Sequence, residues 1–522
     1  MTFKYLKSLI PAAGMVLVLG TTSCVNELDI SPINPQVNTD FVQDEVFVKV
    51  YATLGLTGQE GPAGSGDVAG IDEGTSAFYR LISVANENPT DMVHCCWGDP
   101  GIPEFNNIAW GASDNKIEGL YGRLNFDVTL CNHFLEKTEG LTDDKSVKQR
   151  AEVRFMRALN LYYLMDLYGN VPFSETVSEK LPEQIKRADL FKYIEQELKA
   201  IEPDMYEPMQ APFGRADKSA TWFLLSRMYL NAEVYTGTAQ WGDAITYANK
   251  VIKESGRSLC ENYAQLFMAD NDQNLKARNE IIFPIRQDGI MTRSYGGSLY
   301  VIASTHTNGM NSWGTSEGWG GIRARKTLID KFFVNTPVPM DADETGMVAA
   351  ANDDRALFFA GGDRKLEIEN VNSFKDGLSL TKWSNVRSDN ASSRDPKFTD
   401  TDVPFFRLAE AYLTLAEATL RNGGPEKDAL DAVNELRLRA HASTFATITL
   451  NMILDEKARE FYFEGQRRTD LVRYDYFTTN KYLWEWKGGE KAGTAVNSKF
   501  NIYPIPASDL NANKNLVQNP GY

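Results

Sequence analysis

Hydrophobic side chains between residues 149 and 173 recur at intervals of three and four residues. One apolar stripe includes Phe155 and Tyr162, and a second includes Leu159 and Tyr163. Both stripes fit the 3.6-residue period of an α-helix, and neither fits the alternation of a strand. A helix with two apolar stripes must be covered from two sides, so the pattern predicts packed helices around it. Gly169 is placed to end this helix.

The same period predicts further helices in the rest of the chain. They are expected over residues 40–56, 116–137, 188–201, 214–231, 241–252, 404–421, 426–440 and 450–463. The pair at 214–231 and 241–252 carries alanines at close-contact positions, which is typical of a tetratricopeptide-type repeat. A short strand is predicted at 280–285. The fold class is therefore predicted to be all-α with a few short strands.

Two stretches lack a long helical period. Residues 285–402 are rich in Gly, Ser, Asn and Trp, and residues 78–110 have an irregular pattern. Loops on a rigid scaffold often carry binding residues. We therefore predict one domain over residues 24–522, in which a helical scaffold supports a loop-rich insert at about 285–402.

The first residues are typical of a bacterial lipoprotein signal. Lys4 and Lys7 precede an apolar run over residues 9–19, and the small residue Ser23 precedes Cys24. The run is too short to span a bilayer comfortably and fits a signal peptide over residues 1–23. Thr21 stands where such signals usually carry Leu, so an ordinary secretory signal followed by a free cysteine is the alternative. We expect lipidation of Cys24 and membrane attachment through that lipid.

Charge and cysteine spacing narrow the functional classes. The formal net charge is −16, which argues against a nucleic-acid partner because the chain offers no basic field. The cysteines after Cys24 are at 95, 96, 131 and 260, and their spacing matches no metal site. We expect all four to be unbridged, and the scattered histidines give no zinc motif.

Four aromatic residues in the irregular stretches are candidates for a sugar site. They are Trp97, Tyr295, Trp313 and Trp319. A pyranose ring presents C–H groups on its faces and hydroxyl groups around its edge, so flat aromatic side chains and polar side chains bind it together. Judged alone, an isolated loop tryptophan is more often a packing residue than a ligand platform.

Five segments in order resemble the SusD/RagB family of outer-membrane lipoproteins, and the match is closest to its starch-binding member. They are AEVRFMRALNLYYLMDLYGNVPF, GRADKSATWFLLSRMYLNA, PFFRLAEAYLTLAEA, EKAREFYFEGQRRTDLVRYDYF and the terminal YPIP to NLVQNPGY stretch. The resemblance implies four tetratricopeptide-like helix pairs with a loop-rich, glycan-binding face. It also implies a lipid-anchored, cell-surface location in the outer membrane and a SusC-like TonB-dependent transporter as partner.

The resemblance also implies the ligand and the residues that bind it. Relatives that bind starch place an arc of aromatic rings along an α-1,4-glucan, and the matching positions are Trp97, Tyr295, Trp319 and the polar Arg80. Pro100 stands where those relatives carry Asn, and Asp99 is the expected substitute. The implied function is non-catalytic capture of starch, maltooligosaccharides or cyclodextrin for uptake. A secreted glycoside hydrolase and a binding protein for a different glycan are the alternatives, as is a helical-repeat scaffold that binds peptides.

Three other motifs have weaker chemical interpretations. Residues 314–318 match G-x-S-x-G but lack the strand and helix that a nucleophile elbow needs. Asp270 and Asp272 begin a run rich in side-chain oxygen atoms, but the run does not match an EF-hand loop. We expect a structural calcium ion at these two residues and no required cofactor. Residues 456–473 alternate Glu, Asp and Arg so closely that they favour an ion-pair network over acid–base catalysis.

Overall fold

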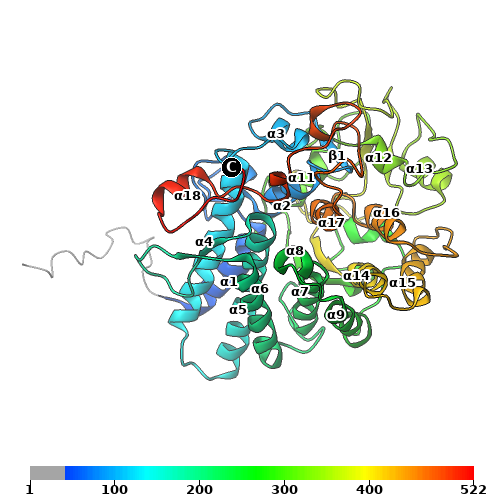
Figure 1. Ribbon diagram of the computed structural model, residues 1–522. Coiled ribbons are helices and arrows are strands. Elements are labelled where there is room, and N and C mark those ends of the chain that lie inside the picture. The colour runs from blue at the N-terminus through cyan, green and yellow to red at the C-terminus, as the bar shows by residue number, and fades with distance from the viewer. Residues whose placement is uncertain (1–40) are drawn as a thin grey trace, which may run out of the picture. The chain divides into compact units, whose positions relative to one another are not determined.

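Eight helices form a side-by-side array in the computed structural model, which describes residues 41–522 (Figure 1). They are α4 (Asn115–Lys137), α5 (Asp144–Tyr168), α6 (Arg187–Ile201), α7 (Lys218–Leu230), α9 (Trp241–Glu254), α14 (Leu408–Arg421), α15 (Glu426–Arg439) and α16 (Leu450–Phe461). Each of the first six packs against the next, and α16 packs against α14. The array contains the helices for four consecutive pairs, and the predicted all-α class is confirmed.

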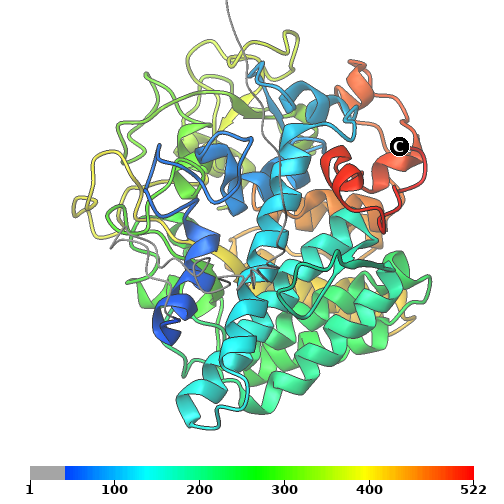
Figure 2. The ribbon, with the colours of Figure 1, turned by 90° about the vertical axis from the view of Figure 1, so that its left-hand side faces the viewer.

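Helix α5 is enclosed on two sides by other elements. Its N-cap residue Asp143 accepts a hydrogen bond from the backbone of Ser146, and Gly169 ends it with φ of 74°. Phe155 meets Phe283 with ring centroids 5.5 Å apart, whereas Tyr163 meets Phe405 from another side at 5.9 Å. Both apolar stripes are therefore covered, as the period predicts. Figure 2 shows α4 and α5, in cyan, lying beside the green helices.

The remaining helices are shorter or lie outside the array. They are α1 (Gln43–Gly55), α2 (Phe78–Glu87), α3 (Ile102–Asn107), α8 (Ala232–Thr236), α10 (Leu275–Glu280), α11 (Ser298–Ala303), α12 (Lys326–Ile329), α13 (Glu344–Ala351), α17 (Arg467–Arg473) and α18 (Ala507–Ala512). Only short elements occur in the insert at 285–402, as predicted. Residues 43–522 form one unit, whereas the predicted signal peptide and Cys24 lie outside the described residues.

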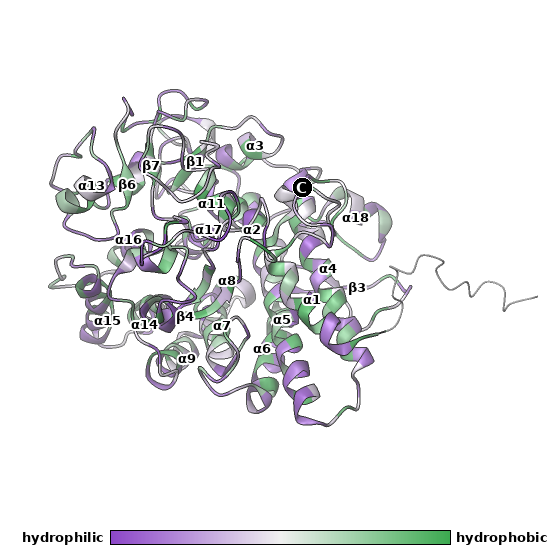
Figure 3. Ribbon diagram, turned by 180° about the vertical axis from the view of Figure 1, so that it is seen from behind, coloured by the Kyte–Doolittle hydropathy of each residue, from purple (hydrophilic) through white to green (hydrophobic). Residues whose placement is uncertain are grey.

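Short strands join the loop-rich part to the array. Strands β1 (Val93–Cys95), β5 (Ile322–Ala324), β7 (Leu378–Leu380) and β6 (Phe358–Phe359) form one antiparallel sheet in that order. Strand β2 (Val171–Phe173) pairs with β3 (Glu183–Ile185), and β4 (Ile281–Ile285) pairs with β8 (Val403–Arg407). In Figure 3 the array helices carry both hydrophilic and hydrophobic colours, as expected of amphipathic helices.

Two sequence-based assignments were wrong. Residues 78–110 are not irregular, since they contain α2, β1 and α3. Helix α2 carries the polar residues Arg80, Ser83 and Glu87 at helical spacing, so its short period was present in the sequence although the helix is buried at every position except Arg80. Residues 404–407 belong to β8 rather than to the following helix, because the buried pair Phe405 and Phe406 continues an apolar run that fits either state.

The charged segment at 456–473 forms the predicted ion-pair network. Arg355, Arg407 and Arg439 all surround the Glu460 carboxylate, and each of these side chains is almost fully buried. Burial alone would raise the pKa of Glu460, but the three guanidinium groups hold it far below its usual range. Such a carboxylate stays ionised and cannot serve as a proton donor near neutral pH.

Two further carboxylates of this segment, Glu464 and Asp470, are also paired. Glu464 accepts hydrogen bonds from Lys382 and Arg407, and Asp470 accepts them from Lys457 and Arg473. The network interpretation is confirmed for this segment.

Cys95, Cys96, Cys131 and Cys260 are unbridged, as predicted. No helix within residues 41–522 is both long and apolar enough to cross a bilayer.

The C-terminal segment returns to the first half of the chain. The Tyr503 hydroxyl donates to the carbonyl of Ala85 at 2.7 Å, and the indole N–H of Trp110 donates to the Tyr522 hydroxyl at 2.9 Å. Asn519 donates to the carbonyl of Tyr168, the last residue of α5. Residues 503–522 therefore cover α2 and the end of α5.

Candidate carbohydrate-binding site

All five side chains predicted to bind glycan line one open pocket of about 440 Å³. Its lining is Ala63, Asp72, Glu73, Gly74, Arg80, Trp97, Asp99, Tyr295 and Trp319. The three aromatic residues are half-buried, so each is held by the protein and still presents part of its ring. This combination of exposed ring surface and charged groups suits a sugar.

The β1–β5 pairing brings the two tryptophans together. Val93 pairs with Ala324 and Cys95 with Ile322, and the ladder continues as the Cys96 N–H donates to the Gly321 carbonyl at 2.9 Å. Trp97 lies two residues after the end of β1, and Trp319 lies three residues before the start of β5. The antiparallel register therefore places them at the same end of the sheet, with ring centroids 6.4 Å apart and planes at 54°.

The third ring enters from the turn before α11. The centroid of Tyr295 lies 6.5 Å from that of Trp319, with an interplanar angle of 42°. Gly74 allows this approach, because a Cβ atom there would lie 2.6 Å from the Cβ atom of Tyr295. The three rings thus form a row in which each is tilted relative to its neighbour.

Both indole N–H groups are already engaged by the protein. Trp97 donates to the carbonyl of Gly320 at 2.7 Å, and Trp319 donates to the carboxylate of Glu317 at 2.7 Å. At Gly321, an added Cβ atom would lie 2.3 Å from the Trp97 ring, so only glycine leaves room for the ring in this position. The two tryptophans therefore offer ring faces to a ligand rather than hydrogen bonds.

Hydrogen bonds to a ligand must come from the charged lining residues. The Arg80 guanidinium stacks 4.9 Å from the centroid of the Tyr300 ring, and none of residues 41–522 accepts a hydrogen bond from it. Asp99 is exposed beside it at the pocket edge. Pro100 provides no side-chain amide, and its carbonyl accepts a hydrogen bond from Lys116 instead.

Sequence reasoning missed two acidic residues, Asp72 and Glu73, which come from the Gly-rich loop before α2. Glu73 accepts hydrogen bonds from the hydroxyl of Thr57 and the backbone N–H of Ala63, and burial raises its pKa. Asp72 is exposed and has carboxylate oxygen available to sugar hydroxyls. Nothing in the local sequence separates this pair from an ordinary acidic turn.

Comparison of the whole chain with known proteins identifies its family. The starch-binding protein SusD of Bacteroides thetaiotaomicron is 50% identical to this chain over 556 aligned residues, which cover 100% of both chains. The chain belongs to the SusD family. The family's own sequence model, described as "SusD family", matches residues 346–522.

Solved structures of SusD-like proteins share the fold. A SusD-like carbohydrate-binding protein from Bacteroides fragilis aligns with a TM-score of 0.71 at 18% identity, over 91% of this chain and 98% of that chain. Surface glycan-binding protein A from Bacteroides thetaiotaomicron, in complex with laminarihexaose, aligns with a TM-score of 0.67 at 19% identity, over 91% and 98%. At this identity the likeness concerns the fold alone.

The remaining sequence candidates lie outside the pocket of this SusD-family chain. Trp313 stacks on His306, with centroids 5.2 Å apart, and does not line the pocket. The G-x-S-x-G segment has no strand before it and no helix after it, so it is not a nucleophile elbow. A larger cleft of about 580 Å³ contains Phe213, but the guanidinium groups of Arg278 and Arg286 lie against that ring. It therefore lacks a free aromatic platform.

The expected calcium ligands are arranged differently from the prediction. Asp270 accepts hydrogen bonds from the backbone and the hydroxyl of Ser388, so its oxygens are engaged. Asp272 and Asp402 both form ion pairs with Arg286, at 3.2 Å and 2.9 Å, and the second carboxylate oxygen of Asp272 is buried without a hydrogen-bond partner. Burial raises the pKa of Asp402 to about 7. Residues 41–522 contain no group of three His, Cys, Asp or Glu side chains suited to a metal.

Proposed function

We propose that this protein binds α-1,4-glucan, in the form of starch, maltooligosaccharides or cyclodextrin, without cleaving it. The observation that carries the proposal is the row of tilted rings formed by Trp97, Trp319 and Tyr295. A straight glycan suits a flat platform, whereas successive tilts of 54° and 42° suit a chain that coils. The 50% identity to a protein named for starch binding supports the same ligand.

The polar lining supports a neutral ligand as well. Arg80 is a hydrogen-bond donor, and Asp72 and Asp99 are acceptors, so both kinds of contact are available around the edge of a sugar ring. The charged lining consists of three acidic side chains and one arginine, so the pocket offers no positive field to select an anionic polysaccharide. Specificity then depends on the shape of the ring platform.

Calorimetry against a small glycan panel tests this proposal. We expect maltoheptaose and β-cyclodextrin to bind, and laminarihexaose to bind at least tenfold more weakly. A clear preference for laminarihexaose would instead support the alternative of a binding protein for a different glycan. Analysis of maltoheptaose after long incubation tests the hydrolase alternative, because shortened products would contradict a non-catalytic role.

We further propose that Cys24 carries a lipid anchor, that the protein is displayed at the cell surface, and that it delivers glycan to a SusC-like TonB-dependent transporter. Membership of the SusD family and the lipoprotein-type signal support this proposal. We expect Cys24→Ala to release the protein from the membrane fraction, while the wild type on intact cells is digested by added protease. Protection of the wild type until the outer membrane is opened would contradict surface display.

We also propose the structural calcium ion expected at Asp270 and Asp272, because one buried oxygen of Asp272 lacks a hydrogen-bond partner. A cation that binds only the folded state raises stability by mass action. We expect 5 mM CaCl₂, compared with EGTA, to raise Tm by about 1–3 °C, as two carboxylates make a weak site. Asp272→Asn should remove the increase. An identical Tm in both buffers would contradict the calcium site.

A further inference from the structure

We propose that Glu317 and Lys397 form a polar tether that fixes the angle between the Trp319 and Tyr295 rings, and so sets the preference for curved glucans. The inference rests on the proposed function of the aromatic pocket. Neither residue lines the pocket, so both act as positioning residues through the rings they hold.

Glu317 connects three groups on its own loop and the next. One carboxylate oxygen accepts the indole N–H of Trp319 at 2.7 Å, and the other lies 3.3 Å from the ammonium group of Lys397. Its backbone carbonyl accepts the indole N–H of Trp313 at 2.6 Å. A charged acceptor makes a stronger hydrogen bond than a neutral one, so the Trp319 indole is held firmly in one orientation.

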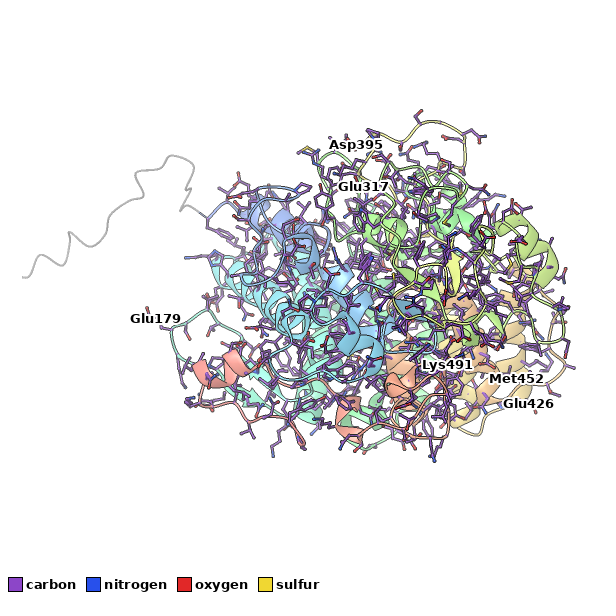
Figure 4. The ribbon with its side chains drawn as sticks, turned by 90° about the horizontal axis from the view of Figure 1, so that it is seen from above. Glu179, Glu317, Asp395, Glu426, Met452 and Lys491 are labelled. Atoms are coloured by element: carbon purple, nitrogen blue, oxygen red, sulfur yellow. The ribbon has the colours of Figure 1, made fainter. Side chains whose placement is uncertain are left out.

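Lys397 extends the tether to the second ring. Its ammonium nitrogen lies 4.9 Å from the centroid of the Tyr295 ring, and a hydrogen bond with Tyr295 raises the pKa of Lys397. The loop that carries Lys397 is joined to the Glu317 loop at the backbone, since the N–H of Ser316 donates to the carbonyl of Pro396 at 2.7 Å. Figure 4 labels Glu317 and Asp395 on the same side of the molecule, where these loops meet.

The backbone around Trp319 is fixed independently of the tether. The N–H of Trp319 donates to the carbonyl of Ala303 at 2.8 Å, and that of Gly320 donates to the carbonyl of His306 at 3.0 Å. The loss of the Glu317 carboxylate should therefore leave the loop in place and free only the indole to rotate. Tyr295 and Trp319 share packing against Leu299 and Phe398, but apolar packing does not select one ring angle as a directional bond does.

The tether has a consequence for ligand choice. A rigid, closed ring of glucose units binds only to platforms that already have its curvature, whereas a linear chain of the same units can adjust. Relaxing the Trp319 angle should therefore weaken β-cyclodextrin binding more than maltoheptaose binding. A simple loss of folded protein would weaken both ligands equally.

Calorimetry with β-cyclodextrin and maltoheptaose tests the tether in four variants. We expect Glu317→Ala and Lys397→Met to weaken β-cyclodextrin about tenfold and maltoheptaose about threefold or less. Glu317→Gln keeps an oxygen that can accept the indole N–H, so we expect it to stay within threefold of wild type for both ligands. Glu369→Ala breaks an exposed pair with Lys491 and is the matched control, for which no change is expected.

Two results separate this inference from the proposed function. If the wild type binds neither ligand, the proposed function fails, and the tether fails with it. If the wild type binds both but Glu317→Ala keeps the wild-type ratio of the two affinities, the tether is overturned while the function stands. Thermal unfolding of each variant identifies any that is misfolded, and in that case Lys397→Met and Glu317→Gln decide the outcome.

Discussion

Replacing Trp97 or Trp319 by alanine is expected to weaken maltoheptaose binding about tenfold or more. Each ring should contribute about 1–2 kcal/mol to binding. This is the free energy gained when a stacked sugar covers apolar ring surface, minus the cost of ordering that sugar. A loss of about 1.4 kcal/mol is a factor of ten in Kd. Both indole N–H groups are bonded within the protein, so the effect measures stacking alone. Calorimetry at 25 °C provides the comparison.

Three controls accompany the tryptophan variants. Trp241→Ala replaces a tryptophan at the start of α9 that does not line the pocket. The affinity of this variant for maltoheptaose should equal that of the wild type. Tyr295→Phe keeps the ring, so it should cost less than either tryptophan. Affinity should change little between 50 and 500 mM NaCl, because the ligand is neutral. Unchanged binding of maltoheptaose in both tryptophan variants would rule out the aromatic row as the binding surface.

The second large effect is expected in the buried ion-pair network. Glu456 is fully buried and contacts Arg355 at 2.7 Å, Arg437 at 2.8 Å and Arg459 at 2.7 Å. The Glu456→Gln substitution keeps the shape of the side chain. Three guanidinium groups nevertheless lose a negative partner in a buried site where water cannot replace it. We expect a loss of about 3–5 kcal/mol in the free energy of unfolding, measured by urea denaturation.

The pH dependence of that loss has a definite direction. Burial would raise the pKa of Glu456, but the guanidinium groups of Arg355, Arg459 and Arg437 hold it at about 2. In the unfolded chain a glutamate has a pKa of about 4.3. The stabilisation is therefore fully present above about pH 5 and is lost as the pH falls from there toward 2. The difference between wild type and variant should shrink over the same range.

An exposed ion pair provides the matched control for the network. Glu369 pairs with Lys491 and both side chains are about half exposed, so Glu369→Ala should cost less than about 1 kcal/mol. If Glu456→Gln were as stable as Glu369→Ala at pH 7, the network would not stabilise the array.

The helical array could be predicted because its apolar side chains recur with the helical period, as the buried Ala244, Ala248 and Val251 do in α9. In α5 and α7 the apolar positions recur with the helical period, and the N-cap side chains of Asp143 and Asp217 mark where each helix begins. Helix α2 has a polar stripe of Arg80, Ser83 and Glu87, so its period could have been recognised despite its shortness. Strand β8 continues an apolar run into α14 and is buried on both sides, which removes the contrast on which periodicity depends.

The binding pocket could be predicted only through the family resemblance. The residues alone give no reason to place Trp97 beside Trp319, since their contact depends on the pairing of β1 with β5, two three-residue strands far apart in the chain. The acidic pair Asp72 and Glu73 was missed because its position depends on the approach of Gly74 to Tyr295. Such long-range placements are properties of the tertiary fold, which local sequence patterns do not encode.

The return of residues 503–522 to the first half of the chain has a consequence for the order of events during synthesis. Tyr168 of α5 and Ala85 of α2 are made early, but their partners Asn519 and Tyr503 lie 351 and 418 residues later in the chain. Helices α2 and α5 therefore lack these contacts until that later segment has been made. A shortened chain that lacks these last residues should remain sensitive to protease however long it is given to fold.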